Sequence, residues 1–93
     1  MTSIALVDDE ESILTSVSLS LESEGFSVDT FPNGIEALKA LETKFYDLGL
    51  FDIKMPKMDG NELLSKVRAS KIETLKKIPI IFLTSKDHEQ DEI

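Results

Sequence analysis

The chain has no cysteine among its 93 residues, and basic residues are scarce. Without cysteine it has neither a disulfide framework nor a thiolate zinc site, which fits a reducing compartment. The 10 Lys and Arg stand against 18 Asp and Glu, so the formal net charge is −8. Nucleic acids and anionic membranes attract clustered Lys and Arg, so this balance argues against either as a partner of this segment.

Long apolar stretches are missing too. The N-terminus, Met1-Thr-Ser-Ile, lacks a basic region followed by an apolar one, and no apolar run approaches the length that crosses a membrane. We therefore expect a soluble, cytoplasmic protein. With 41% hydrophobic and 30% charged residues, the length suits one domain with a real core and is too short for two.

Short apolar segments alternate with helical patterns along the chain. A helical apolar stripe begins at Glu11 and stops at Gly25, which suits a left-handed C-cap. Asn33 and Asp59 are each followed three residues later by Glu, and this capping pattern predicts two more helix starts. The connections are long enough for helices, so we expect an α/β fold with a parallel sheet and helices on both faces. The predicted strands are residues 3–7, 26–31, 46–51 and 78–83.

Two of these strands run into acidic residues. Residues 4–7 lead into Asp8 and Asp9, and residues 48–51 lead into Asp52. The carboxyl ends of parallel strands lie at the same edge of a sheet, so we expect the three carboxylates to meet in one crevice. At about 4 Å and an effective dielectric near 20, each like-charge pair costs about 4 kcal/mol. Such a cluster must hold protons or a hard cation such as Mg²⁺.

The residues at the strand ends resemble a known family. Asp8-Asp9, the run from Asp52 to Gly60 (DIKMPKMDG) and Thr84-Ser85 resemble the response-regulator receiver domain of two-component signalling, and the resemblance covers the whole chain. Residues 4–9, 51–56 and 82–87 also resemble the ChvI type of winged-helix transcriptional regulator. The resemblance implies a flavodoxin-like, doubly wound parallel sheet with strand order 2-1-3-4-5.

The same resemblance implies roles for individual residues. It makes Asp52 the acceptor of a phosphoryl group from a sensor histidine kinase, with Thr84 as the switch hydroxyl. Mg²⁺ would be bound by Asp52, Asp9, Asp8 (mainly through water) and the Lys54 backbone carbonyl. Residues implied to flank the pocket are Lys54, Met55, Pro56, Ser85 and Lys86.

Such a domain signals by changing protein contacts and is not an enzyme in the metabolic sense. Its output would be regulation of transcription through a DNA-binding domain that residues 1–93 do not contain. We expect this segment to contact neither nucleic acid nor membrane.

The C-terminal end leads us to expect an incomplete receiver domain. Asp87 and Gln90 form a helix-start pattern only a few residues before Ile93, and the later Lys of the family pattern is missing. The last strand and helix of the implied order are then absent from residues 1–93, and the apolar run 80–83 forms an open edge. We expect a homodimer through this edge or by segment exchange, unless further residues of a longer chain cover it.

Three other functions stay open. A Mg²⁺-dependent aspartyl-phosphate phosphohydrolase would use a similar crevice, although one common form needs an Asp where this chain has Lys54. A flavin-binding domain of the same topology needs a hydroxyl- and glycine-rich loop where this chain has Asp8 and Asp9. A non-phosphorylated interaction module is the third, and the missing later Lys makes it less remote than it would otherwise be. In isolation, Asp8-Asp9 would also suit an ordinary helix start, but Asp52 beside them favours a site.

Overall fold

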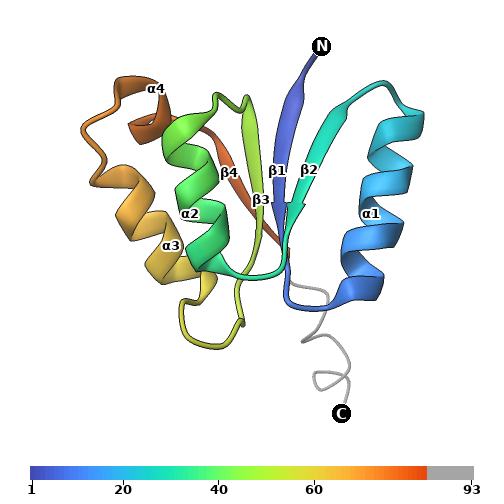
Figure 1. Cartoon of the computed structure of the whole chain (residues 1–93), viewed down its shortest axis with the longest axis horizontal. Helices are drawn as coiled ribbons and strands as arrows, with labels where there is room; N and C mark the ends of the chain where they lie inside the picture. Colours follow the sequence, from blue (N-terminus) through green and yellow to red (C-terminus); the bar gives the residue numbers. More distant parts are fainter. Residues whose placement is uncertain (84–93) are drawn as a thin grey trace.

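Strands and helices alternate along the chain, as the sequence pattern predicts (Figure 1). The computed structural model describes residues 1–83. No helix among these residues is long and apolar enough to cross a bilayer. The elements are β1 (Ser3–Val7), α1 (Glu11–Ser23), β2 (Ser27–Phe31), α2 (Gly34–Thr43), β3 (Leu48–Asp52), α3 (Gly60–Arg68), α4 (Glu73–Lys76) and β4 (Ile80–Leu83).

The four strands form one parallel sheet in the order β2-β1-β3-β4. This order confirms the flavodoxin-like arrangement that the resemblance implies for the first four strands. Val7 at the end of β1 lies opposite Phe31 of β2 and Phe51 of β3. Within residues 1–83, β4 pairs only with β3, and its Ile81 is 54% exposed. A homodimer through this edge stays a prediction.

The helices cover both faces of the sheet, so the strands are buried from two sides. In Figure 1, α1 lies on one side of the sheet, and α2 and α3 lie on the other. Successive residues of β1 point to opposite faces, so Leu6 packs toward α1 while Ala5 and Val7 pack toward α2 and α3. Burial of a Leu or Val side chain stabilises the fold by about 1.5–3 kcal/mol, which explains why β1 is almost entirely apolar.

Three strands begin later than the sequence pattern predicts. β4 begins at Ile80 rather than at residue 78, because Pro79 has no N–H to donate to the sheet. β2 begins at Ser27 because the N–H of Phe26 instead donates to the carbonyl of Leu21 at the end of α1 (3.2 Å). The predicted left-handed residue after α1 is confirmed: Gly25 has a φ of +97°.

The short helix α4 was not predicted, because a single turn leaves no apolar periodicity to recognise. Arg68, in the last turn of α3, holds the segment in place. Its Nη1 atom donates to the carbonyls of Lys76 (3.0 Å) and Ile78 (2.7 Å), and Leu75 of α4 is buried. The connection between α3 and β4 is therefore a built part of the fold.

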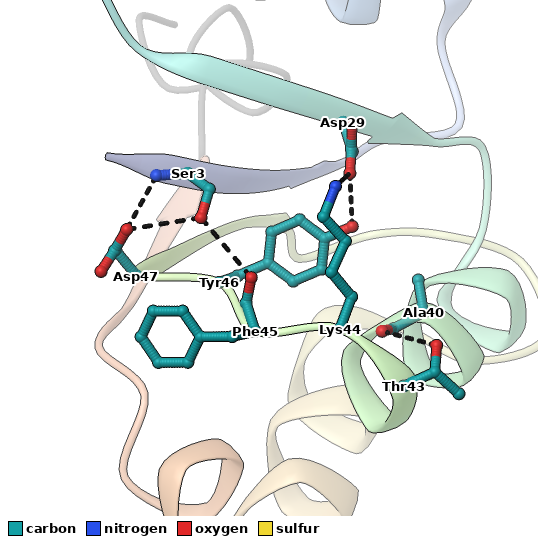
Figure 2. Close-up of polar contacts among 8 residues, drawn as sticks. All are labelled: Ser3, Asp29, Ala40, Thr43, Lys44, Phe45, Tyr46 and Asp47. Atoms are coloured by element: carbon teal, nitrogen blue, oxygen red, sulfur yellow. Dashed lines mark hydrogen bonds and ion pairs between the residues drawn. The ribbon is translucent and has the colours of Figure 1, made fainter. Parts of the chain in front are cut away.

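Polar contacts fasten the loop between α2 and β3 to the two strands beside it (Figure 2). The hydroxyl of Tyr46 donates to Asp29 Oδ2 (2.5 Å), and Lys44 Nζ lies 2.8 Å from the same oxygen. Asp47 Oδ2 accepts from the backbone N–H of Ser3 (2.8 Å). These contacts keep residues 46 and 47 in the loop, so β3 begins at Leu48 rather than at residue 46.

The contacts around Asp29 also shift two pKa values. Hydrogen bonds from Lys44 and from Tyr46 lower the pKa of the Asp29 carboxyl below its usual 3.8. Burial and the hydrogen bond to Asp29 raise the pKa of Tyr46, so the phenol stays protonated and remains a donor. An exposed ion pair such as Lys44–Asp29 contributes about 0.2–1 kcal/mol, so the part-buried phenol hydrogen bond is at least as important.

Glycine at the start of α3 allows the helix to pack directly against the end of β3. A Cβ atom on Gly60 would lie 2.4 Å from the carbonyl oxygen of Asp52 and 3.0 Å from Cα of Ile53. Both obstacles are backbone, so they cannot turn aside. Meanwhile the Gly60 N–H donates to the Ile53 carbonyl (2.9 Å). The first turn of α3 therefore fixes the backbone at Asp52.

Replacing Tyr46 by Phe should lower the free energy of unfolding by about 1 kcal/mol at pH 7, because Asp29 loses a hydrogen bond. Because the pKa of Asp29 is lower in the folded chain than in the unfolded chain, its ionised form stabilises the fold. This stabilisation is complete above the pKa of the unfolded chain and is lost as pH falls through the pKa of the folded chain. The difference between wild type and Tyr46→Phe should therefore narrow below about pH 4. Urea unfolding at several pH values measures it, and a difference that is unchanged in acid would contradict this account.

Replacing Gly60 by Ala should lower the free energy of unfolding by about 2 kcal/mol, because the new methyl group overlaps fixed backbone. Ser65→Ala is the matched control, since Ser65 is exposed on the same helix and should change stability by less than about 0.5 kcal/mol. Denaturant unfolding of both variants provides the measurement. If both behave alike, the packing of α3 on Asp52 is looser than described.

Candidate functional site

The structure brings together the three carboxylates that the sequence predicts to converge. Asp52 is the last residue of β3, and Asp8 directly follows β1. Because β1 and β3 are parallel neighbours with Val7 opposite Phe51, both acids leave the sheet at the same edge. One carboxylate oxygen from each of Asp8, Asp9 and Asp52 lies within 4.8 Å of the others. The sequence therefore predicted the composition of this cluster correctly.

The cluster is partly buried. Asp8 and Asp52 are each only 2% exposed, whereas Asp9 is open to solvent. Burying carboxylates is costly unless donors or cations compensate them. One donor is the backbone N–H of Glu10, which lies 2.9 Å from Asp8 Oδ1. The site thus has two buried carboxylates, Asp8 and Asp52, and one carboxylate at the surface, Asp9.

The loop after β3 is held in place on both sides. Met55 and Met58 are buried, with Met55 in the core between the sheet and the helices α2 and α3. A Cβ atom on Gly34, the first residue of α2, would lie only 3.0 Å from Sδ of Met58, so α2 packs tightly on this loop. Lys57 adopts the left-handed region with a φ of 71°, a conformation that is unusual for a residue other than Gly. These constraints fix the path of the loop that carries Lys54.

The other residues that were implied to flank the pocket lie at different places. Pro56 is exposed, and its carbonyl accepts from the N–H of Met58 (2.8 Å) in the tight turn. Thr84, Ser85 and Lys86 lie outside the described residues, as does the helix start that was predicted at Asp87.

The donor set suits a small, hard cation. Mg²⁺ binds oxygen ligands at about 2.0–2.1 Å, so two oxygens on one ion are at most about 4.2 Å apart. Adjacent oxygens on one octahedral Mg²⁺ are about 2.9 Å apart. The carboxylate oxygens of Asp8, Asp9 and Asp52 lie within 4.8 Å of one another, so the side chains would rotate inward to share one ion. All three donors are oxygen and none is sulfur or imidazole, which favours Mg²⁺ over zinc.

Sequence reasoning missed three residues that shape the site. The Glu10 N–H was not singled out, although an Asp two residues before an N–H is a familiar turn signal. The tight contact of Gly34 with Met58 joins two parts of the chain that no local pattern relates. The left-handed conformation of Lys57 left no signal, because Lys rarely adopts it.

Comparison with known proteins gives a consistent result. The family profile described as "Response regulator receiver domain" matches residues 4–93. The alkaline phosphatase synthesis transcriptional regulatory protein PhoP of Bacillus subtilis is 43% identical over 90 residues, which are 97% of this chain and 36% of PhoP. The chain spans about a third of the length of the curated relatives that it matches.

Solved structures agree with the sequence relatives. The crystal structure of histidine kinase ThkA in complex with response regulator protein TrrA matches with a TM-score of 0.82 and 40% identity, covering 95% of this chain and 72% of that one. The receiver domain of a sensor histidine kinase from Pseudomonas aeruginosa, solved with a magnesium ion in its active-site cleft, matches with a TM-score of 0.85 and 31% identity. That match covers 98% of this chain and 73% of the other.

The narrower resemblance to the ChvI type stays a prediction.

Sequence and structure point to one family. The family profile matches nearly the whole chain, and regulators such as PhoP are similar in sequence. The parallel sheet with its acidic cluster agrees with both. The chain belongs to the response-regulator receiver domains, which are signalling domains of two-component systems.

Proposed function

We propose that this domain accepts a phosphoryl group on Asp52 and passes the signal on through altered protein contacts. The observation that carries the proposal is the position of Asp52: it is the last residue of a central strand, 2% exposed, and clustered with two further carboxylates. A carboxylate surrounded by carboxylates is a poor acceptor for an anionic phosphoryl group unless a cation is present. The cluster supplies the ligands for that cation.

Bound Mg²⁺ would neutralise the charge that develops on the phosphoryl oxygens during transfer. Asp9 and Asp52 would bind the ion directly, and Asp8 would bind it mainly through water. The backbone carbonyl of Lys54 would be the remaining protein ligand. The Glu10 N–H orients Asp8 for this task. Met55 and Met58 anchor the loop that presents the Lys54 carbonyl, and α3 fixes the Asp52 backbone through Gly60.

The phosphoryl donor in this proposal is a histidine kinase. One structural relative, TrrA, was solved in complex with the kinase ThkA. Several curated relatives are transcriptional regulators that are nearly three times as long as the matched region, so we further propose that the signal regulates transcription. Thr84 is the proposed switch hydroxyl, and Lys54, Met55, Pro56, Ser85 and Lys86 are the proposed flanking positions. We also propose a cytoplasmic location, as for a partner of a kinase domain.

Binding of Mg²⁺ should raise the free energy of unfolding, because the unfolded chain has no preformed site. At a Mg²⁺ concentration about 100 times the dissociation constant, the gain should be about 2.7 kcal/mol. Asp9→Asn should remove most of this gain. Glu22→Gln, which removes an exposed acid from α1, is the matched control and should keep it. Thermal unfolding with MgCl₂ and then with a chelator measures the effect, and a gain that is equal in Asp9→Asn would contradict the site.

Exposure to a small acyl phosphate in the presence of Mg²⁺ should add one phosphoryl group to the chain, and intact-mass measurement would detect it. Asp52→Asn should show no gain. Asp59→Asn is the matched control, because Asn also caps a helix and Asp59 lies in the cap of α3. An equal gain in Asp52→Asn, or a gain that does not depend on Mg²⁺, would overturn the proposed function.

A further inference from the structure

A groove lies at the edge of the sheet opposite the carboxylate cluster. It is formed where the connection from α2 to β3 meets the connection from α3 to α4, so it borders the amino ends of the strands. Its volume is about 180 Å³, and Phe45 and Ile72 supply its apolar walls. The groove shares no residue with the carboxylate cluster, so the proposed function does not account for it.

The apolar walls of the groove are unusually open to solvent. Phe45 is 58% exposed and Ile72 is 42% exposed. The backbone at Phe45 is held in place, because its neighbours Lys44 and Tyr46 both bind Asp29. In Figure 2, the Tyr46 ring points toward Asp29, whereas the Phe45 ring points away from it. The fold therefore holds an aromatic ring at the surface, where its exposed area favours contact with a partner.

The size of the groove limits what it accepts. Sites for small molecules and cofactors are generally about 300–1,000 Å³, which is larger than this groove. A cavity of about 150 Å³ accepts a benzene ring, so the groove matches a single bulky side chain such as Leu or Phe. One buried anchor of this kind is a common centre of a peptide or protein interface.

The lining of the groove holds one acid, Glu42, and one base, Lys44, which pairs with Asp29. The excess of positive charge that indicates the sign of the partner lies in the chain beside the groove. Residues 66–77, from the end of α3 through α4, carry five bases and one acid, and Lys77 pairs with that acid, Glu73 (3.5 Å). Some of this charge offsets the helix dipoles of α3 and α4, but Lys71 lies between the two helices and has no such role. The five bases are Lys66, Arg68, Lys71, Lys76 and Lys77.

The rest of the molecule has the opposite charge. Residues 1–38 contain no Lys or Arg, and α1 lies across the sheet from α3 (Figure 1). An acidic ligand is therefore repelled by one end of the molecule and attracted to the other. The acids in this stretch are Asp8, Asp9, Glu10, Glu11, Glu22, Glu24, Asp29 and Glu36.

We propose that this groove docks an acidic segment of another protein, with one bulky apolar side chain of that segment inserted between Phe45 and Ile72. Acidic residues beside the anchor are attracted by the excess of bases in residues 66–77, above all by Lys71, which directly precedes Ile72 in the chain. The surface is a second contact site, separate from the carboxylate cluster, and it does not require phosphorylation of Asp52.

An NMR titration of the ¹⁵N-labelled chain with the blocked peptide Asp-Glu-Phe-Glu-Asp tests the proposal. Amide shifts should concentrate at residues 42–46 and 72–75 and should be absent at Asp8 and Asp52. Replacing Phe by Gly in the peptide, or the acids by Lys, should abolish them. Phe45→Ser should weaken binding about 10-fold through loss of an anchor contact. Leu19→Ser is the matched control, because Leu19 is 61% exposed on α1, and it should leave binding unchanged.

Variants that change charge measure how much of the peptide affinity is electrostatic. Lys71→Glu should weaken binding about 3-fold at low salt, while Lys39→Glu, with the same charge change on α2, should have a smaller effect. Equal binding of the basic peptide, or an unshifted Phe45 amide, would overturn the proposal. Concentration-dependent shifts of the groove without peptide would assign it to a second copy of this chain instead. Binding of a DNA or RNA oligonucleotide in place of the peptide would also overturn it.

Discussion

Like charges held close together are the constraint on which this domain depends. At the separation of the carboxylates in the cluster, each pair costs about 4 kcal/mol at an effective dielectric near 20. The fold can bear this repulsion because the acids follow strands whose apolar residues are buried, and that burial stabilises the fold. Residues 4–7 of β1 are at most 1% exposed, and Ile4, Leu6 and Val7 each contribute about 1.5–3 kcal/mol on burial. The core therefore forces the carboxylates together, and a cation relieves the repulsion that results.

The backbone around the cluster is correspondingly rigid. Gly60 has no room for a methyl group against the backbone of Asp52, and a methyl group on Gly34 would press on Met58. A metal site needs ligands that stay near their bound positions. These packing contacts position the backbone beside the ligands even without a bound cation. At the other end of the sheet, the contacts of Asp29 and Asp47 hold a loop whose only solvent-facing aromatic ring is Phe45. The same parallel sheet thus presents two different chemical surfaces, one at each edge.

The sequence predicted the fold and the carboxylate cluster because both depend on local patterns. Apolar runs that end in acid, capping pairs at Asn33 and Asp59, and Gly25 after α1 are all visible within a few residues. The strand starts were less accurate, because side chains of Tyr46 and Asp47 bind partners far away in the chain. The turn of helix α4 and the groove beside it were missed for the same reason. The segment with α4 depends on Arg68 reaching the carbonyls of Lys76 and Ile78, and the groove depends on Phe45 and Ile72 lying near each other. No periodicity records either.

The spacing of the strands in the sequence also matters for how the chain acquires its site. β1 pairs with β3, and the linking contact between Ser3 and Asp47 joins residues 44 positions apart. Contacts of such long range form after the local ones, because the chain must first close a large loop. During synthesis, Asp8 and Asp9 leave the ribosome well before Asp52 does. The repulsive cluster is therefore assembled only when β3 docks, at the step in which most of the apolar core becomes available to offset it.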